Sequence, residues 1–315
     1  MARRIVTPDG TGLHVQESGP SRAPVTVLLA HGWTLDERCW APVADMLATG
    51  GASTGLYPRV VRYDHRAHGR SDDTPASSMT LEQLADDMAE VIAQVCPSGP
   101  LVLAGHSMGG MTVMTLAQRY PDLVAERVRG VALVATASGG LDGAATLGLH
   151  GRPARTFLAG KQRVEGSRRW TERRELTRHP VLMRPGMRAM LLGRRPGPQA
   201  LRLTCEAIAG CRPTTVSGFT QTLTTHERDA ALAAFADMPV EVMVGSRDRL
   251  TPPRLAHRIR THLPRSAMTI FPDAGHMLPV ERVDSVGTRI AALARQATEV
   301  GPDERHARTA RQINS

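Results

Sequence analysis

The most informative stretch of the chain reads Leu101-Val-Leu-Ala-Gly-His-Ser-Met-Gly-Gly110. Its first four residues form a continuous apolar run, which is typical of a strand buried on both faces. An apolar helical pattern follows from Met111 to Gln118 and stops near Pro121. The sequence therefore predicts a buried strand, a glycine-rich turn and a helix, with Ser107 in the turn.

The turn fits the pattern G-x-S-x-G in the strand-to-helix context that this pattern requires. Glycines suit it because side chains flanking the serine would collide with the neighbouring strand and helix. Strained backbone angles lift the hydroxyl clear of the sheet, and the following helix directs N–H groups at developing negative charge. The alternative is an ordinary strand-to-helix turn. The apolar strand and helix favour Ser107 as a nucleophile.

Apolar runs alternate with amphipathic stretches elsewhere in the chain, which indicates βαβ units around a mostly parallel sheet. The predicted strands are Val25–Ala30, Arg59–Tyr63, Leu101–Ala104, Val128–Ala135, Val240–Val244 and Ala267–Phe271. The predicted helices are Glu37–Leu47, one that Thr80 opens and Cys96 ends, Met111–Gln118 and Ser285–Ala297. The fold class is thus α/β, with helices flanking the sheet.

This alternation is lost between residues 138 and 237, where arginine, glycine and proline are frequent and the helical pieces are short. We expect residues 1–137 and 238–300 to form the α/β core. Residues 138–237 are expected to form a mainly helical cap, of the size of a small domain. The polar residues 301–315 are expected to be a disordered tail.

Along almost its whole length the chain resembles the α/β-hydrolase superfamily, in its serine esterase and lipase-like branch. The resemblance implies that Asp248, after the strand 240–244, is the acid of a catalytic triad, and that His276, after the strand 267–271, is its histidine. In that family the histidine takes the proton of the serine, here Ser107, and the acid fixes the histidine tautomer. On its own, an aspartate in a turn of this kind is often a capping residue, and a lone histidine is most often structural. Their order along the chain favours the triad.

The segment His31-Gly-Trp-Thr34 resembles the oxyanion loop of the same family. The resemblance implies that the N–H groups of Trp33 and Met108 bind the oxyanion. The ring of Trp33 either walls the acyl site or packs against the core. His31 is expected to form a hydrogen bond within its own loop.

A second loop, Asp64 to Ser71, resembles the family pattern D-x-R-G-x-G-x-S, with Ala67 where glycine is usual. Its role there is structural. His65 and His68 have the spacing of a metal-binding pair, but no cysteine or carboxylate cluster accompanies them, so no metal site is expected.

Serine at position 107 favours hydrolysis of an ester, lactone or thioester through an acyl-serine intermediate, without a cofactor. Epoxide hydrolases and haloalkane dehalogenases of the superfamily use an aspartate nucleophile and are disfavoured. Carbon–carbon hydrolases usually carry tryptophan where this chain has Met277. A cofactor-free perhydrolase of the non-haem haloperoxidase type and an acyltransferase remain open on the same triad, with a non-catalytic binding protein as a distant alternative.

Methionines supply the candidate substrate pocket. Met183, Met187 and Met190 have helical spacing and, with Met277, could line an adaptable apolar pocket, although such a stripe is more often core. Arginine is abundant from Arg152 to Arg195. These arginines form a solvated face or attract an acidic substrate, such as a carboxylate or a carrier-bound acyl group.

The formal net charge of +9 comes almost wholly from arginine, because the chain has one lysine. No nucleic-acid motif accompanies it, so the expected partner is a small acyl substrate and not a nucleic acid. The four cysteines are scattered without a C-x-x-C pair, which suits a reducing compartment. No signal-peptide core and no membrane-length apolar run occur. The expected location is the cytoplasm.

Overall fold

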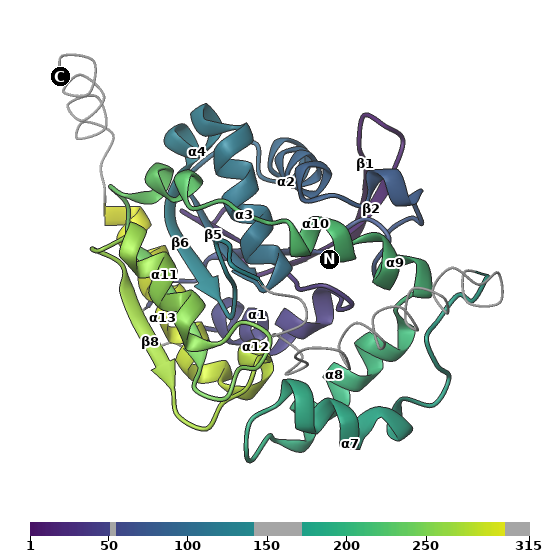
Figure 1. Cartoon of the computed structure of the whole chain (residues 1–315). Coiled ribbons are helices and arrows are strands. Elements are labelled where there is room, and N and C mark those ends of the chain that lie inside the picture. The colour runs from purple at the N-terminus through teal and green to yellow at the C-terminus, as the bar shows by residue number, and fades with distance from the viewer. Residues whose placement is uncertain (51–54, 142–171, 300–315) are drawn as a thin grey trace.

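The computed structural model of the chain describes residues 1–50, 55–141 and 172–299 (Figure 1). The strands are β1 (Ala2–Val6), β2 (Gly12–Ser18), β3 (Thr26–Ala30), β4 (Arg59–Tyr63), β5 (Leu101–His106), β6 (Val128–Val134), β7 (Val240–Gly245) and β8 (Ala267–Phe271). They form one sheet in the order β1-β2-β4-β3-β5-β6-β7-β8. The pairs β1–β2 and β2–β4 are antiparallel and all others are parallel, which confirms the predicted α/β fold with a mostly parallel sheet.

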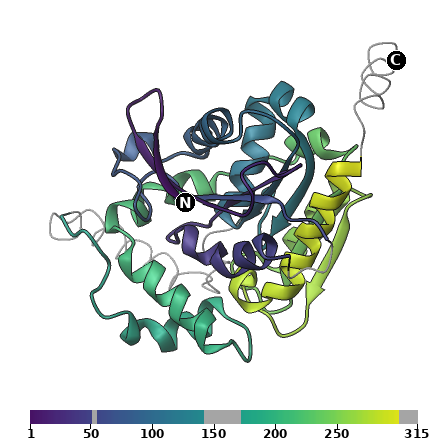
Figure 2. The same ribbon diagram turned by 180° about the vertical axis from the view of Figure 1, so that it is seen from behind.

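Helices cover both faces of this sheet. The α-helices of the described residues are α1 (Ala41–Ala48), α2 (Leu81–Val95), α3 (Met108–Arg119), α4 (Pro121–Arg127), α7 (Pro180–Leu191), α8 (Pro198–Gly210), α9 (Pro213–Gly218), α10 (Thr220–Thr224), α11 (Pro253–His262), α12 (Leu278–Glu281) and α13 (Val283–Glu299). Short 3-10 helices occur at η1 (Glu37–Trp40), η2 (Ala76–Ser78) and η3 (Ala230–Phe235). Figure 2, which views the molecule from behind, shows α1 and α13 in front of the sheet.

The central strands are mostly apolar because both of their faces are buried. Along β5, Val102 and Ala104 pack in the cluster that contains residues of α1 and α13. Leu101 and Leu103 alternate with them and pack in the cluster that contains residues of α2 and α3. The sheet thus separates two hydrophobic cores, and the carboxyl ends of its parallel strands share one edge.

The structure differs from the predicted elements in several places, and the helices α4 and α11 were not predicted. The strands β1 and β2 were not predicted. The helix expected over Glu37–Leu47 is divided into η1 and α1, because Pro42 lacks an N–H and is tolerated only in the first turn of an α-helix. The helix after the serine begins at Met108, three residues before its apolar run.

The described part of the predicted cap contains α7, α8, α9, α10 and η3, and α7 packs along α8 below the sheet in Figure 1. Residues 142–171 of that segment and the predicted tail at 301–315 lie outside the described residues. None of the helices in the described ranges is long and apolar enough to cross a membrane.

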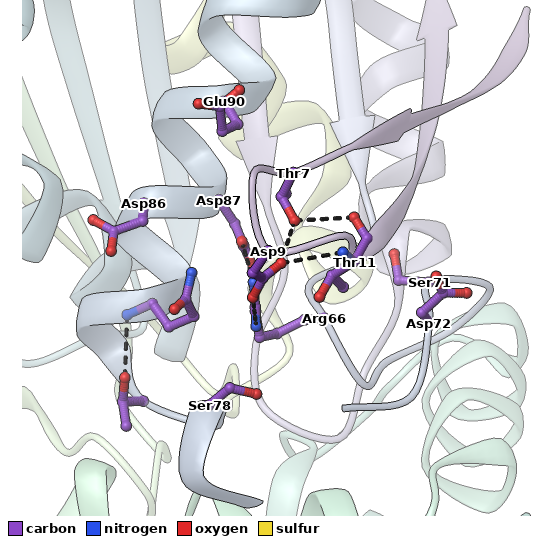
Figure 3. A network of polar contacts seen from close by, with 12 residues as sticks. Thr7, Asp9, Thr11, Arg66, Ser71, Asp72, Ser78, Asp86, Asp87 and Glu90 are labelled. Carbon is purple, nitrogen blue, oxygen red and sulfur yellow. Dashed lines mark hydrogen bonds and ion pairs between the residues drawn. The ribbon is translucent and has the colours of Figure 1, made fainter. Parts of the chain in front are cut away.

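A buried ion pair joins α2 to the loop after β4 (Figure 3). The side chains of Arg66 and Asp87 are fully buried, and the guanidinium donates to both carboxylate oxygens, at 2.7 and 2.6 Å. Arg66 Nη1 also donates to Asp9 at 2.8 Å, and Asp9 accepts hydrogen bonds from Thr7 and Thr11 in the β1–β2 turn. The pair therefore connects three segments that are distant in sequence.

Replacing Arg66 by leucine is expected to lower the free energy of unfolding by about 3–5 kcal/mol, because it leaves a buried carboxylate without its partner. The matched control is Arg119→Leu. It removes a pair of similar geometry with Asp86 on the same helix, but there the two side chains are 40% and 29% exposed. That control is expected to cost at most about 1 kcal/mol. Urea denaturation measures both losses, and equal losses would contradict the role given to the buried pair.

Candidate active site

Ser107 occupies a strained turn between β5 and α3. Its backbone has φ 53 and ψ −118, in a region that residues other than glycine rarely adopt. Its N–H donates to the carbonyl of Val134 at 3.0 Å, and its own carbonyl accepts from Thr136 Oγ1 at 2.7 Å and from the N–H of Gly110 at 2.9 Å. These bonds come from the end of β6, from Thr136 just after it and from the first turn of α3, and they hold the strained conformation in place.

Steric limits explain the two glycines of the turn. A Cβ on Gly105 would lie 2.4 Å from the carbonyl oxygen of Gly109. A Cβ on Gly109 would lie 2.2 Å from the carbonyl oxygen of Ala30, at the end of β3. Both distances are far below van der Waals contact, so the helix can follow the strand this closely only when both positions are glycine.

Asp248 and His276 form a buried pair in the loops after β7 and β8. His276 Nδ1 lies 2.9 Å from Asp248 Oδ2, and because an ionised carboxylate only accepts, Nδ1 carries the hydrogen. The other oxygen, Oδ1, accepts from the N–H groups of Leu250 and Thr251 at 2.9 and 2.8 Å, and Thr251 Oγ1 donates to Oδ2 at 2.8 Å. The carboxylate is thus fixed, and Nε2 of His276 is left as the nitrogen that accepts a proton.

The turn at Ser107 contacts the loop that carries His276 through the residue before the serine, His106. His106 directly precedes Ser107, and its Nε2 donates to the carbonyl of His276 at 2.9 Å. The two imidazole rings lie 4.9 Å apart between centroids. Within the described residues, no hydrogen bond joins Ser107 Oγ to the His276 ring. Such bonds are often long or poorly aligned before substrate binds.

Sequence reasoning did not assign a role to His106. It is completely buried, and burial lowers its pKa to about 3, so the ring is neutral. Because Nε2 donates, Nδ1 carries no hydrogen, and it is a buried atom without a hydrogen-bond partner in the described part of the chain. The only signal available in the sequence was its position directly before the candidate nucleophile.

The segment His31–Thr34 lies beside the turn at Ser107. A Cβ on Gly32 would lie 3.1 Å from Ser107 Cβ. Among the described residues, neither the N–H of Trp33 nor that of Met108 donates to a protein acceptor. Two free N–H groups beside a serine are the donors that a developing oxyanion requires. The indole of Trp33 donates to the carbonyl of Thr215 at 3.3 Å, so its ring packs toward α9.

Three buried histidines support this segment. The N–H of His65 donates to His31 Nε2 at 3.0 Å, and the N–H of Thr34 donates to His68 Nε2 at 3.2 Å. Burial lowers the pKa of all three rings, that of His68 to about 3, so the rings are neutral. His31 and His68 accept these two bonds, and His65 Nε2 donates to the carbonyl of His31 at 3.1 Å. In the described ranges, no group of three histidine, cysteine or acidic side chains is arranged to hold a metal ion.

The loop that carries His65 and His68 holds Ala67 in a backbone conformation that is unusual for alanine. Its φ is 61, in the left-handed region where glycine is favoured. Its N–H donates to the carbonyl of Asp72 at 2.8 Å, and its carbonyl accepts from Thr215 Oγ1 at 2.7 Å. These two bonds hold alanine in a conformation that glycine would adopt without strain.

The methionines of the predicted substrate pocket lie in different surroundings. Met183 and Met187 are half-buried and pack against the core cluster that contains residues of α1 and α13. Met190, on the same helix, is 36% exposed, and Met277 is buried. Contact between any of them and a substrate stays a prediction.

The fold is that of a known family. A family model described as "Alpha/beta hydrolase family" matches residues 27–287. The chain belongs to the α/β hydrolase family.

Individual relatives include enzymes of differing chemistry. The pimeloyl-[acyl-carrier protein] methyl ester esterase of Nitrosomonas europaea is 28% identical over 279 residues, which are 84% of this chain and 92% of that protein. The non-heme chloroperoxidase of Streptomyces lividans is 31% identical over 125 residues, 39% of this chain and 42% of that protein. Other curated relatives likewise match over less than half of their own length. A thermophilic esterase from Thermogutta terrifontis, solved with malate bound, has a TM-score of 0.72 at 24% identity and covers 95% of this chain and 99% of its own.

Proposed function

We propose that the chain is a serine hydrolase that cleaves a carboxylic ester, lactone or thioester. Ser107 Oγ attacks the carbonyl carbon while His276 Nε2 takes its proton, and the N–H groups of Trp33 and Met108 bind the oxyanion. Collapse of the tetrahedral intermediate breaks the bond to the alcohol or thiol, which leaves with the proton from His276. Water then attacks the acyl-serine and gives one proton to His276. Collapse of this second intermediate breaks the bond to Ser107 Oγ, which takes the proton back from His276 as the acid is released. Asp248 stabilises the imidazolium in both steps.

One observation carries this proposal. A serine with left-handed backbone angles stands at the start of α3, and the residue before it contacts a buried histidine–aspartate pair. A strained nucleophile next to an oriented base is the arrangement of nucleophilic catalysis. The methyl ester esterase of Nitrosomonas europaea, which matches most of the chain, supports an ester as substrate.

Residues 138–237 are proposed to act as a cap over this site. The end of α7 and the segment after it are hydrogen-bonded to the loop that carries His276, and this supports the proposal. The carbonyl of Leu191 accepts from the N–H of His276 at 2.7 Å, and the N–H of Arg194 donates to the carbonyl of Asp273 at 2.9 Å. A segment tied so closely to the catalytic histidine is well placed to select the acyl group.

A perhydrolase is the second candidate, because the similarity to the Streptomyces lividans chloroperoxidase favours it. Both reactions start from the same acyl-serine and differ in whether water or hydrogen peroxide attacks it. In an acyltransferase, an alcohol would attack the acyl-serine in place of water.

The test is hydrolysis of p-nitrophenyl acetate, butyrate and octanoate at neutral pH, with a parallel assay of peroxide-dependent halogenation. Nitrophenolate release without halogenation supports the hydrolase, and the chain-length profile measures the acyl site. Halogenation that exceeds hydrolysis would favour the perhydrolase. If none of the three esters is hydrolysed and no halogenation occurs, both the hydrolase and the perhydrolase are contradicted.

His106 is expected to act as a positioning residue for His276. His106→Phe removes the donor to the His276 carbonyl, and we expect it to lower kcat about tenfold, the value of one hydrogen bond. KM should change less than about twofold, because the substrate contacts remain. His106→Gln restores an N–H donor and is expected to recover most of the rate.

The pH profile of kcat/KM separates this role from a structural one. A displaced His276 shifts the acid limb of the profile in His106→Phe, whereas a loss of folded protein alone lowers the whole profile without a shift. An unshifted profile with equal rates in the phenylalanine and glutamine variants would refute the positioning role.

A further inference from the structure

A cavity of about 460 Å³ lies between α7 and the loop after β7. Arg188 and Arg194 line it from α7 and the segment after it, and Arg247 and Arg249 line it from the loop. We call this cavity the arginine pocket. Ser107 does not line it, so it is distinct from the turn at Ser107.

The positive charge in this pocket is only partly balanced. Arg247 Nε pairs with Asp273 at 2.7 Å. In the part of the chain that the structure describes, Arg188, Arg194 and Arg249 form no ion pair with a carboxylate. Asp248, the one acid among the lining residues, is buried and already bound to Thr251 and His276.

Many other arginines in the described ranges do form ion pairs with acids. Arg258, for example, contacts both Glu227 and Asp229. Four arginines and one acid, Asp248, line the cavity, which leaves a local excess of positive charge that attracts anions.

The lining also indicates what kind of anion fits. Guanidinium groups match the planar geometry of carboxylates and the oxygens of phosphates, often through two parallel hydrogen bonds. Pro185, Ala189 and Leu192 add an apolar wall. The volume falls in the range of about 300–1,000 Å³ that is usual for small-molecule sites. We propose that the arginine pocket binds a small organic anion, with a carboxylate or phosphate group held by Arg188, Arg194 and Arg249.

The position of the pocket gives such a ligand a structural consequence. One wall continues from Leu191, whose carbonyl accepts from the N–H of His276, and the other contains Asp248, which binds the His276 ring. A ligand that spans the two walls joins the two segments that hold His276.

Binding is tested with the Ser107→Ala protein, which removes the proposed nucleophile, by isothermal titration calorimetry with hexanoate and with phenyl phosphate. Hexanamide and phenol serve as neutral analogues. In the same background, Arg188→Gln/Arg249→Gln removes two charges from the pocket. The matched control, Arg22→Gln/Arg260→Gln, removes two exposed arginines outside it.

At least one anion is expected to bind with a one-to-one stoichiometry, at least about tenfold more tightly than its neutral analogue. The pocket variant is expected to bind it at least about tenfold more weakly, and the control within about twofold of the parent. The anion that binds more tightly, hexanoate or phenyl phosphate, shows whether the pocket prefers a carboxylate or a phosphate.

Three results would overturn the proposal: no saturable binding of either anion, equal binding of the neutral analogues, or equal losses in the two double variants. Because binding is measured without turnover, these results are independent of whether the chain hydrolyses esters.

Discussion

Replacing Ser107 by alanine is expected to lower kcat/KM for p-nitrophenyl butyrate by at least about 10⁴-fold, because it removes the atom that forms the acyl-enzyme. The oxyanion donors and the acyl site remain, so a small residual rate above that of water is expected. Alanine keeps the Cβ and adopts the same turn, and the variant should unfold at the temperature of the wild type.

The control for this variant is Ser217→Ala. Ser217 lies on α9, and its hydroxyl donates only to carbonyls of its own helix, Pro213 and Thr214, at 3.2 Å. We expect it to leave kcat/KM within about twofold, as for substitutions away from the reacting atoms. A Ser107→Ala variant that keeps a tenth or more of the activity would reject the nucleophile.

Asp248→Asn is expected to lower kcat on the order of 10⁴-fold. The asparagine is nearly the same size and is held at Oδ1 by the N–H groups of Leu250 and Thr251. Its amide nitrogen then faces His276 Nδ1 and donates to it, so the hydrogen of the ring moves to Nε2. That tautomer has no lone pair with which to take the proton of Ser107.

The matched control is Thr251→Val, which removes the hydroxyl donor to Asp248 Oδ2 but keeps the carboxylate and the side-chain volume. It is expected to cost about tenfold or less in kcat, the value of one hydrogen bond. Steady-state kinetics with p-nitrophenyl butyrate measures both variants. Similar losses for the two would show that the loop is only structural and that Asp248 does not set the histidine tautomer.

The parts of the fold that the sequence predicted best are those with one dominant physical signal. The strands β4 and β8 have the bounds that their apolar patterns predicted, Arg59–Tyr63 and Ala267–Phe271. In β1 at the sheet edge only Ile5 is buried, so the strand carries no clear alternation. Its formation depends on pairing with β2, which no local pattern reports.

The residues of the candidate site also differ in how well the sequence predicted them. The turn at Ser107 was predictable because its glycines and the flanking apolar residues are local. The pairing of Asp248 with His276 was expected only from the resemblance to a family. The contact of His106 with the carbonyl of His276 joins residues 170 positions apart, and the arginine pocket joins α7 to the loop after β7. Such contacts arise from tertiary packing and leave no periodic signal.

The central claim, that Ser107 carries the acyl group, is tested most directly by covalent labelling. The wild-type protein is treated with a fluorophosphonate until reaction stops, digested, and analysed by peptide mass spectrometry. We expect one adduct per chain, on Ser107, formed in parallel with the loss of p-nitrophenyl butyrate hydrolysis and absent from the Ser107→Ala protein. An adduct on a different residue that accompanies the loss of activity, or no adduct at all, would contradict the claim.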